Sequence, residues 1–424
     1  MLMKTNRPAA WILVLLCVVE SVVAFSAGAA PLPLTGVNIA GGEFWLARKP
    51  DDSVRPQYGI NYCYPNQAEI KYFARQGMNF FRYPFCWETL QPKLRTPLDQ
   101  TDLQRLKSAV RLATSQKLVV ILDPHNYARY YGTNIVGGPT VSAADFADFW
   151  GRLAAEFKDD SHVWFGLVNE PHDMPTAQWI DAANAAIAAI RGAGARNMIL
   201  VPGNSWTGAQ SWLSEDYGGG SNARNIINIH DPLDYWAIEV HQYLDSDCSG
   251  THNSVVSTNI GSARLKEFVD WCRQNHKRAI LGEFAVPVVP EGQATVDDML
   301  QSVERDQDVW LGWTWWAAGA LWGDYLFTLE PVQGRDRPQM AWLRPHLGGP
   351  ATPAFAVTVK SGTGGGNLVA CTAHAIKADP APAGMAFKHW TGDTAWLENP
   401  AAEKTIVTVP FKDVQVEAVF EKAM

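Results

Sequence analysis

The segment Val163-Trp164-Phe165-Gly166-Leu167-Val168-Asn169-Glu170-Pro171 decides how this chain is interpreted, because an apolar run of one strand's length ends in a carboxylate. A second segment, Ala279-Ile280-Leu281-Gly282-Glu283-Phe284, has the same form. A charge at the mouth of a buried strand costs desolvation free energy unless a neighbour neutralises it or a reaction uses it. The two segments therefore predict a site in which Glu170 and Glu283, each at the end of a strand, face the same bond of a substrate.

Apolar strand patterns alternate with amphipathic helical patterns from Gly36 to about Gly348. Eight strands are expected, at 36–39, 79–84, 118–123, 163–168, 198–202, 237–241, 279–284 and 309–315. Helical patterns between them include 101–116, 143–157, 177–192 and 262–274, and Thr101 or Asp102 is the expected N-cap of the first. Eight βα units predict an α/β fold of the TIM (β/α)8 barrel type. A doubly wound sheet is the alternative, but Gly36–Gly42 lacks its Gly-rich phosphate turn.

The composition changes near residues 346–353, where glycine and proline cluster. Apolar residues then recur at every second position over 355–359 and again over 414–420, which is typical of half-buried strands. The segment Gly362–Gly366 is expected to form a hairpin loop. We therefore divide the chain into a leader (1–29), a (β/α)8 domain (30–348) and a small all-β module (352–424).

The first 29 residues have the order of a secretion signal: a positive start, an apolar run over 9–25 and small residues over 26–30. Ala27-x-Ala29 is the expected cleavage site, with Ala24 as a second candidate. A membrane anchor is the alternative, but Glu20 interrupts the apolar run, which is short for a span. We expect a secreted, extracellular protein without a membrane span after cleavage, and the periplasm or the cell surface are alternative locations.

The net charge and the cysteine spacing argue against two classes of protein, those that bind nucleic acid and those with a structural zinc site. The net charge of −8 and the pI near 5.7, without a basic stripe, argue against a nucleic-acid partner. Five cysteines remain after the signal, and Cys63 with Cys86 and Cys248 with Cys272 are plausible local disulfides, which would leave Cys371 over. Spacing does not prove these pairings. No CxxC occurs, so a structural zinc site is not expected.

Polar or aromatic side chains follow six of the expected strands, at the barrel end where the chemistry of this fold takes place. They are Arg82, His125, Asn126, Asn169, Glu170, His241, Tyr243, Glu283, Trp315 and Trp316. Each has a structural alternative: a buried ion pair for Arg82, a satisfied histidine for His125, core packing for Trp316. Glu239 shares a face with His241 and is expected to form structural hydrogen bonds. The joint occurrence of these types on one rim favours a site that binds and cleaves sugars.

These residues resemble the glycoside hydrolase family 5 cellulases, through Asn169-Glu170-Pro171, Arg82, His125, His241-x-Tyr243 and Gly282-Glu283. The resemblance covers about residues 35–345 and is strongest to the fungal-type endo-β-1,4-glucanase branch, through 241–247 and 313–319. The C-terminal module resembles a bacterial surface-protein β-repeat, through 387–393 and the final strand, and we assign no chemistry to it. It replaces the cellulose-binding domain that such enzymes often carry, so soluble or amorphous β-1,4-glucan is the expected substrate.

The resemblance implies a role for each side chain. Glu170 would be the acid/base, with a pKa raised by burial and by the second carboxylate, and Glu283 would be the ionised nucleophile supported by Arg82 and Tyr243. Asn169 would bind the 2-hydroxyl of the sugar. The resemblance gives His125 and His241 sugar binding or orientation of the acid/base, and Trp316 a stacking surface. Asn126, beside His125 at the same strand end, is also expected among the substrate contacts. A separation of about 5–5.5 Å between the two carboxyls would mean double displacement with retention.

Two other functions stay open at this point. A related β-glycanase could cleave mannan, xyloglucan or mixed-linkage glucan, and the loops around Trp87, Trp206, Trp236 and Trp322 would decide between these substrates. A non-catalytic carbohydrate-binding surface protein is the alternative from another class. We expect no metal and no organic cofactor, β-1,4-glucan as the partner, and a monomer.

Overall fold

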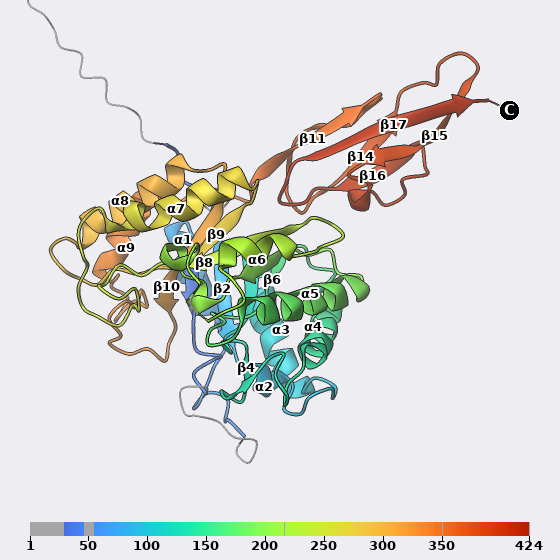
Figure 1. The fold of residues 1–424 in the computed structure, drawn as a ribbon. Helices are drawn as coiled ribbons and strands as arrows, with labels where there is room; N and C mark the ends of the chain where they lie inside the picture. Colours follow the sequence, from blue (N-terminus) through green and yellow to red (C-terminus); the bar gives the residue numbers. More distant parts are fainter. Residues whose placement is uncertain (1–28, 46–54, 216, 350, 424) are drawn as a thin grey trace, which may run out of the picture.

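The computed structural model describes residues 29–45, 55–215, 217–349 and 351–423 (Figure 1). Eight parallel strands close a barrel in the order β1-β10-β9-β8-β7-β6-β3-β2. Their bounds are β1 Leu34–Ile39, β2 Phe80–Phe85, β3 Val119–Pro124, β6 Val163–Gly166, β7 Ile199–Pro202, β8 Trp236–His241, β9 Ala279–Glu283 and β10 Trp310–Ala318. The predicted TIM barrel is therefore confirmed. The predicted leader, apart from Ala29, lies outside the described residues.

Helices surround the barrel because the connections between its parallel strands contain them, and α9 follows the last strand. They are α1 Gln67–Gln76, α2 Trp87–Leu90, α3 Gln100–Thr114, α4 Ala143–Phe157, α5 Thr176–Gly192, α6 Asn222–Asn225, α7 Ile260–Gln274, α8 Gly292–Arg305 and α9 Pro338–Leu343. The four predicted helices start and end within two residues of their expected positions. The predicted cap was wrong: the Asp99 carboxylate accepts from the Asp102 amide and caps α3, since Asp102 instead accepts the hydroxyls of Tyr62 and Tyr64. Within the described ranges, no helix is long and apolar enough to cross a membrane.

Inward-facing side chains fill the barrel in layers, because successive residues of a strand face opposite sides. Phe80 of β2 and Trp164 of β6 pack edge to face at 5.1 Å near the start of the strands. Two residues further along the same face of β2 comes Arg82, which is completely buried. The side chains inside the barrel therefore change from apolar at the level of Phe80 to charged at the level of Arg82.

The C-terminal residues form two small sheets, as the sequence predicted. One has the order β13-β11-β17-β15 (Gly366–Val369, Ala354–Lys360, Val414–Lys422, Met385–Gly392), and the other β12-β14-β16 (Gly362–Thr363, Ala373–Ala378, Lys404–Thr408). The glycine-rich segment 362–366 is more than a hairpin loop, because β12 within it pairs with β14 while β13 returns to β11. Gly364 has φ +100°, and a Cβ there would lie 2.4 Å from Ala375 O, so glycine is required.

These sheets contact the end of the barrel at which the strands begin. The Phe411 ring, 1% exposed, lies edge to face on Trp164 with ring centres 5.0 Å apart. The Phe411 amide donates to the Tyr235 hydroxyl at 2.7 Å, and the Tyr235 ring packs on Trp396 at 4.8 Å. One hydrophobic cluster therefore continues from the barrel interior into the C-terminal sheets.

The two expected disulfides are not formed. Cys63, Cys248, Cys272 and Cys371 carry free thiols, and the Cys86 thiol donates to the Glu43 carbonyl oxygen at 3.5 Å. Cys86 and Cys272 are completely buried, each within its own packed environment. The two cysteines of each expected pair lie in neighbouring βα segments, but this did not bring their sulfur atoms together.

Candidate active site

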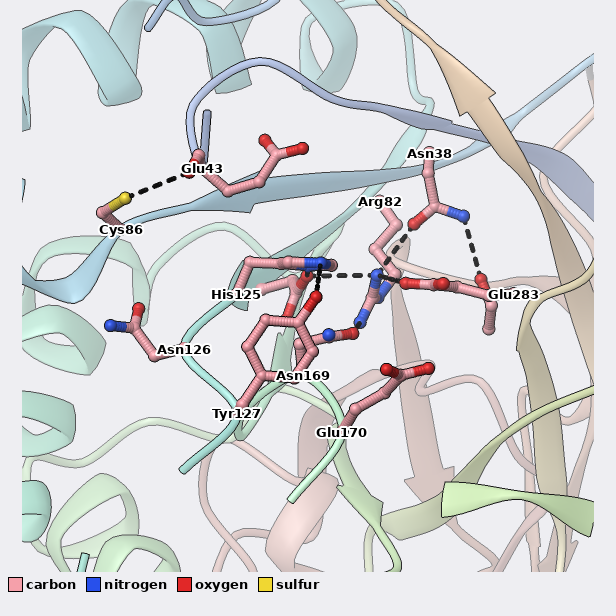
Figure 2. A network of polar contacts seen from close by, with 12 residues as sticks. Asn38, Glu43, Arg82, Cys86, His125, Asn126, Tyr127, Asn169, Glu170 and Glu283 are labelled. Carbon is pink, nitrogen blue, oxygen red and sulfur yellow. Dashed lines mark hydrogen bonds and ion pairs between the residues drawn. The ribbon is translucent and has the colours of Figure 1, made fainter. Parts of the chain in front are cut away.

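Arg82 occupies the centre of a cluster of charged side chains contributed by several strands (Figure 2). Its guanidinium lies 2.8 Å from Glu239 Oε1, 2.8 Å from Glu283 Oε1 and 3.1 Å from Asp123 Oδ2. Burial alone would lower the pKa of Arg82, but the three carboxylates raise it above its ordinary value. The guanidinium therefore stays charged and holds β2, β3, β8 and β9 in one arrangement.

Glu283 ends β9 and is buried. Arg82 Nη1 donates to its Oε1, and the Tyr243 hydroxyl donates to its Oε2 at 2.7 Å. Burial and the Glu283 charge raise the pKa of Tyr243 well above its ordinary value, so the hydroxyl keeps its proton and remains a donor. Both oxygens of Glu283 are thus fixed by hydrogen bonds, one from Arg82 in β2 and one from Tyr243 in the loop after β8.

Glu170 follows β6 in a left-handed conformation with φ +40°, which is uncommon for a residue with a side chain. Its Oε1 accepts from His241 Nδ1 at 2.7 Å, while His241 Nε2 faces Glu239 Oε1 at 3.3 Å. Burial alone would lower the pKa of His241, but Glu283, Glu170 and Glu239 raise it to about 10. Burial raises the pKa of Glu170, and the His241 cation opposes part of that rise.

The two glutamates predicted from the sequence are brought together. A carboxylate oxygen of Glu170, a ring nitrogen of His241 and a carboxylate oxygen of Glu283 all lie within 4.8 Å of one another. One oxygen of each carboxyl is therefore close enough for the two groups to face the same bond of a substrate, as glycoside hydrolysis by two carboxyls requires. The predicted role of Glu239 is also found, since its carboxylate bonds both Arg82 and His241.

Asn169 precedes Glu170 and presents one unused donor. Its Oδ1 accepts from Arg82 Nη2 at 2.8 Å, whereas its buried Nδ2 has no hydrogen-bond partner among the described residues. An unpaired buried donor costs about 1–3 kcal/mol, and this amide nitrogen can still donate a hydrogen bond.

His125 and Trp316 form an aromatic pair beside the charged cluster. Their rings are stacked with centres 5.2 Å apart, and His125 Nδ1 bonds Asp123 Oδ2 at 2.8 Å. Burial alone would lower the pKa of His125, but Asp123 raises it. Trp315, in contrast, is completely buried and donates to the Phe327 carbonyl, so it belongs to the core.

Asn126 does not fit its predicted role as a substrate contact. Its amide nitrogen donates to both Glu88 oxygens, at 2.9 and 2.7 Å, and its Oδ1 accepts from the Trp87 amide at 2.8 Å. Burial raises the pKa of Glu88 to about 7. With both ends of the amide occupied, Asn126 fixes the loop after β3, although it borders the cleft.

The cleft consists of two cavities, of about 720 and 690 Å³, which share Tyr127 and His172. The first includes Glu170, His241, Tyr243 and Trp206; the second includes Glu43, His125, Trp316 and Trp322. Of the four tryptophans expected to shape the cleft, Trp206 and Trp322 do so. Trp87 is buried, and Trp236 starts β8 at the opposite end of the barrel.

Glu43, Tyr127 and His172 are among the residues of the cleft that the sequence did not predict. The His172 ring stacks on Trp206 at 4.5 Å and meets Tyr127 edge to face at 5.7 Å, which places these rings between the cavities. Tyr127 lies two residues after His125, and His172 two after Glu170. Their position just after a strand end could have identified both residues in the sequence. The same holds for Glu43, which lies four residues after the end of β1.

This fold and this pair of carboxyls define a glycosidase. Residues 33–319 match the family model for cellulase (glycosyl hydrolase family 5), and the chain belongs to this family. Residues 355–424 match the model for the divergent InlB B-repeat domain. The resemblance expected from the sequence is confirmed in both parts of the chain.

Individual relatives and solved structures that match this chain also have endoglucanase names. Endo-beta-1,4-glucanase A of Emericella nidulans is 41% identical over 324 residues, which cover 76% of this chain and 94% of the relative. An endo-beta-1,4-glucanase of Xanthomonas axonopodis pv. citri matches with a TM-score of 0.71 and 46% identity, over 74% of this chain and 98% of its own. The Pseudomonas stutzeri endoglucanase Cel5A in complex with cellobiose matches with a TM-score of 0.68 and 34% identity, over 76% and 94%.

Proposed function

We propose that this enzyme is a retaining endo-β-1,4-glucanase in which Glu170 is the acid/base and Glu283 is the nucleophile. The arrangement of the two carboxyls supports the proposal: one oxygen of Glu170 lies within 4.8 Å of one oxygen of Glu283, Glu283 is bonded to Arg82 and Tyr243, and Glu170 is bonded to His241. Such a short separation suits direct attack by one carboxylate on the sugar. The relatives with endoglucanase names support the β-1,4-glucan class.

The reaction then has two steps. In the first, a Glu283 oxygen attacks the anomeric carbon while Glu170 gives its proton to the glycosidic oxygen, which leaves with the departing chain. In the second, Glu170 takes a proton from water, and that water replaces Glu283 at the same carbon. The raised pKa of Glu170 suits a group that must hold a proton before the first step.

The neighbours support these two roles. The free Nδ2 of Asn169 can donate to the 2-hydroxyl of the sugar, a contact that strengthens in the transition state. Trp316 offers an apolar face, with His125 stacked against it, to the ring at the cleavage point. His241 orients Glu170, and Arg82 orients Glu283. The cavities on both sides of Tyr127 and His172 suit a chain that continues in two directions.

We also propose the setting in which this reaction takes place. The leader sequence supports secretion, to the exterior, the periplasm or the cell surface. We propose 30–348 as the catalytic domain and 352–424 as a separate β-rich module, with a monomer as the working form. The separate family matches support that division.

The test measures reducing sugar released from carboxymethyl cellulose. Glu170→Gln and Glu283→Gln should each lose at least about 10³-fold in kcat, since each removes a group that takes part in bond cleavage. Glu330→Gln is the control, because Glu330 is a partly buried glutamate that does not line either cavity. NMR of the first product should show the β-anomer. Full activity in either site variant, or an α-anomer, would contradict the proposal.

A substrate panel separates the alternatives within the family. Mannan, xyloglucan and mixed-linkage glucan are compared with carboxymethyl cellulose at equal mass. A tenfold higher activity on mannan than on carboxymethyl cellulose would identify mannan as the substrate. The proposed roles of the two glutamates would stay the same. Binding without any hydrolysis would favour the non-catalytic alternative.

A further inference from the structure

Glu43 is a buried carboxyl that the mechanism above does not use. It lies in the turn after β1, only 6% exposed, and its side chain borders the second cavity together with His125, Trp316 and Trp322. In Figure 2 Glu43 lies on the far side of His125 from Glu170. It therefore belongs to the half of the cleft that faces away from the acid/base.

The bonding of Glu43 is incomplete. Its Oε2 accepts from the Gly41 amide at 2.7 Å and the carboxyl is also bonded by the backbone amide of Glu43 itself, but among the residues described here no other residue donates to it or forms an ion pair with it. Burial raises the pKa of Glu43 to about 7, although the nearby His125 charge lowers it. A buried carboxyl with an open oxygen on a cavity wall is costly unless a ligand supplies the missing hydrogen bond.

The surroundings of Glu43 suit a sugar ring. The Phe44 and Trp322 rings meet edge to face at 4.7 Å, and Trp316 meets Trp322 at 5.9 Å, so aromatic side chains line the same cavity. A sugar is apolar on its faces and carries hydroxyls at its rim, so an aromatic surface beside a carboxylate can hold both parts.

We propose that Glu43 is a substrate-contacting residue whose open oxygen bonds a hydroxyl of a sugar on the side of the cleavage point that keeps the covalent link to Glu283. The assignment rests on the proposed function, because the acid/base defines which half of the cleft receives the departing chain. Glu43 then contributes to the affinity for the glucan and not to bond cleavage.

Bracing of the loop is the competing role for Glu43, and the chain offers a matched control for it. Glu330 Oε2 accepts from the Gly319 amide at 3.2 Å, and burial raises its pKa to about 7 as well. Gly41 and Gly319 even share an unusual backbone, with φ of +140° and +135°. Glu330, however, does not line either cavity. A bracing role would thus be lost in both variants, and a sugar contact only in Glu43→Gln.

The experiment measures cellotetraose binding by calorimetry in the full chain, with Glu170→Gln as the inactive parent. Adding Glu43→Gln should weaken binding about 10-fold, and Glu43→Ala up to about 100-fold, as expected for the loss of a hydrogen bond to a charged group. Adding Glu330→Gln should leave the affinity unchanged. In the active enzyme, Glu43→Gln should raise KM with little change in kcat. Circular dichroism verifies that Glu43→Gln is folded.

Three results would overturn the inference. An unchanged affinity in folded Glu43→Gln would remove the sugar contact, while the parent still binds and the active enzyme still cleaves. An equal loss in Glu330→Gln would show that both residues only brace their loops. A parent that binds no cellotetraose, together with a wild type that releases no reducing sugar, would instead refute the proposed function and this inference with it.

Discussion

Replacement of Phe411 by alanine tests whether the C-terminal sheets stabilise the barrel. The ring is 1% exposed and lies between Trp164 of the barrel, at 5.0 Å, and Phe355 of β11, at 6.1 Å. The loss of a fully buried phenyl ring leaves a cavity and costs ~3–5 kcal/mol. We expect about 4 kcal/mol, because the Trp164 ring borders the cavity and the Phe411 amide keeps its bond to Tyr235 in the variant.

The assay is urea unfolding followed by two probes. Hydrolysis of carboxymethyl cellulose reports on the barrel, and far-ultraviolet circular dichroism reports on the whole chain. In Phe411→Ala both probes should lose stability together, since the removed ring packs directly on Trp164 of the barrel. Phe420→Ala is the control: its half-buried ring packs on Phe387 within the C-terminal sheet, so activity should persist to the wild-type urea concentration.

Either of two results would show that the C-terminal sheets do not stabilise the barrel as expected. A loss below about 1 kcal/mol would mean that the cavity collapses or that Phe411 is not buried in solution. An early circular dichroism transition with an unchanged activity midpoint would mean that the sheets unfold alone and that the barrel does not depend on them.

Three further predictions concern single side chains. Tyr243→Phe removes the hydroxyl that donates to Glu283 at 2.7 Å, a bond to a charged group worth ~1.5–3 kcal/mol, so kcat on carboxymethyl cellulose should fall about 10- to 100-fold with little change in melting temperature. Burial raises the pKa of Glu170 and His241 opposes that rise, so His241→Gln should move the alkaline limb of the kcat/KM profile to higher pH. Burial alone would lower the pKa of His346, but Glu304 and Asp297 raise it. The stabilisation from His346 is therefore complete below its unfolded pKa near ~6.5 and is lost as pH rises through the raised value, so His346→Gln should destabilise more at pH 5 than at pH 9 in urea unfolding.

The sequence predicted the barrel and the central charged cluster because both follow from the order of the strands. Once eight apolar runs are parallel, Arg82, Glu170 and Glu283 must meet at one rim. Asn126 failed this test because its side chain points to Glu88, and the direction of a side chain in a loop does not follow from strand order. Glu43 was missed for the same reason, since its place on the cavity wall depends on the path of one turn.

The two ends of the barrel carry different kinds of side chains. Phe80 and Trp164 form an apolar layer at the end where the strands begin, and Phe411 covers that layer from outside. Arg82, at the centre of the charged cluster, lies two residues beyond Phe80 on the same face of β2. The C-terminal sheets therefore extend the apolar packing at the end where the strands begin, whereas the loops at the opposite rim line the two cavities beside Glu170 and His125. Because the two regions lie at opposite ends of the strands, Phe411→Ala is expected to change stability without changing the contacts that line the cleft.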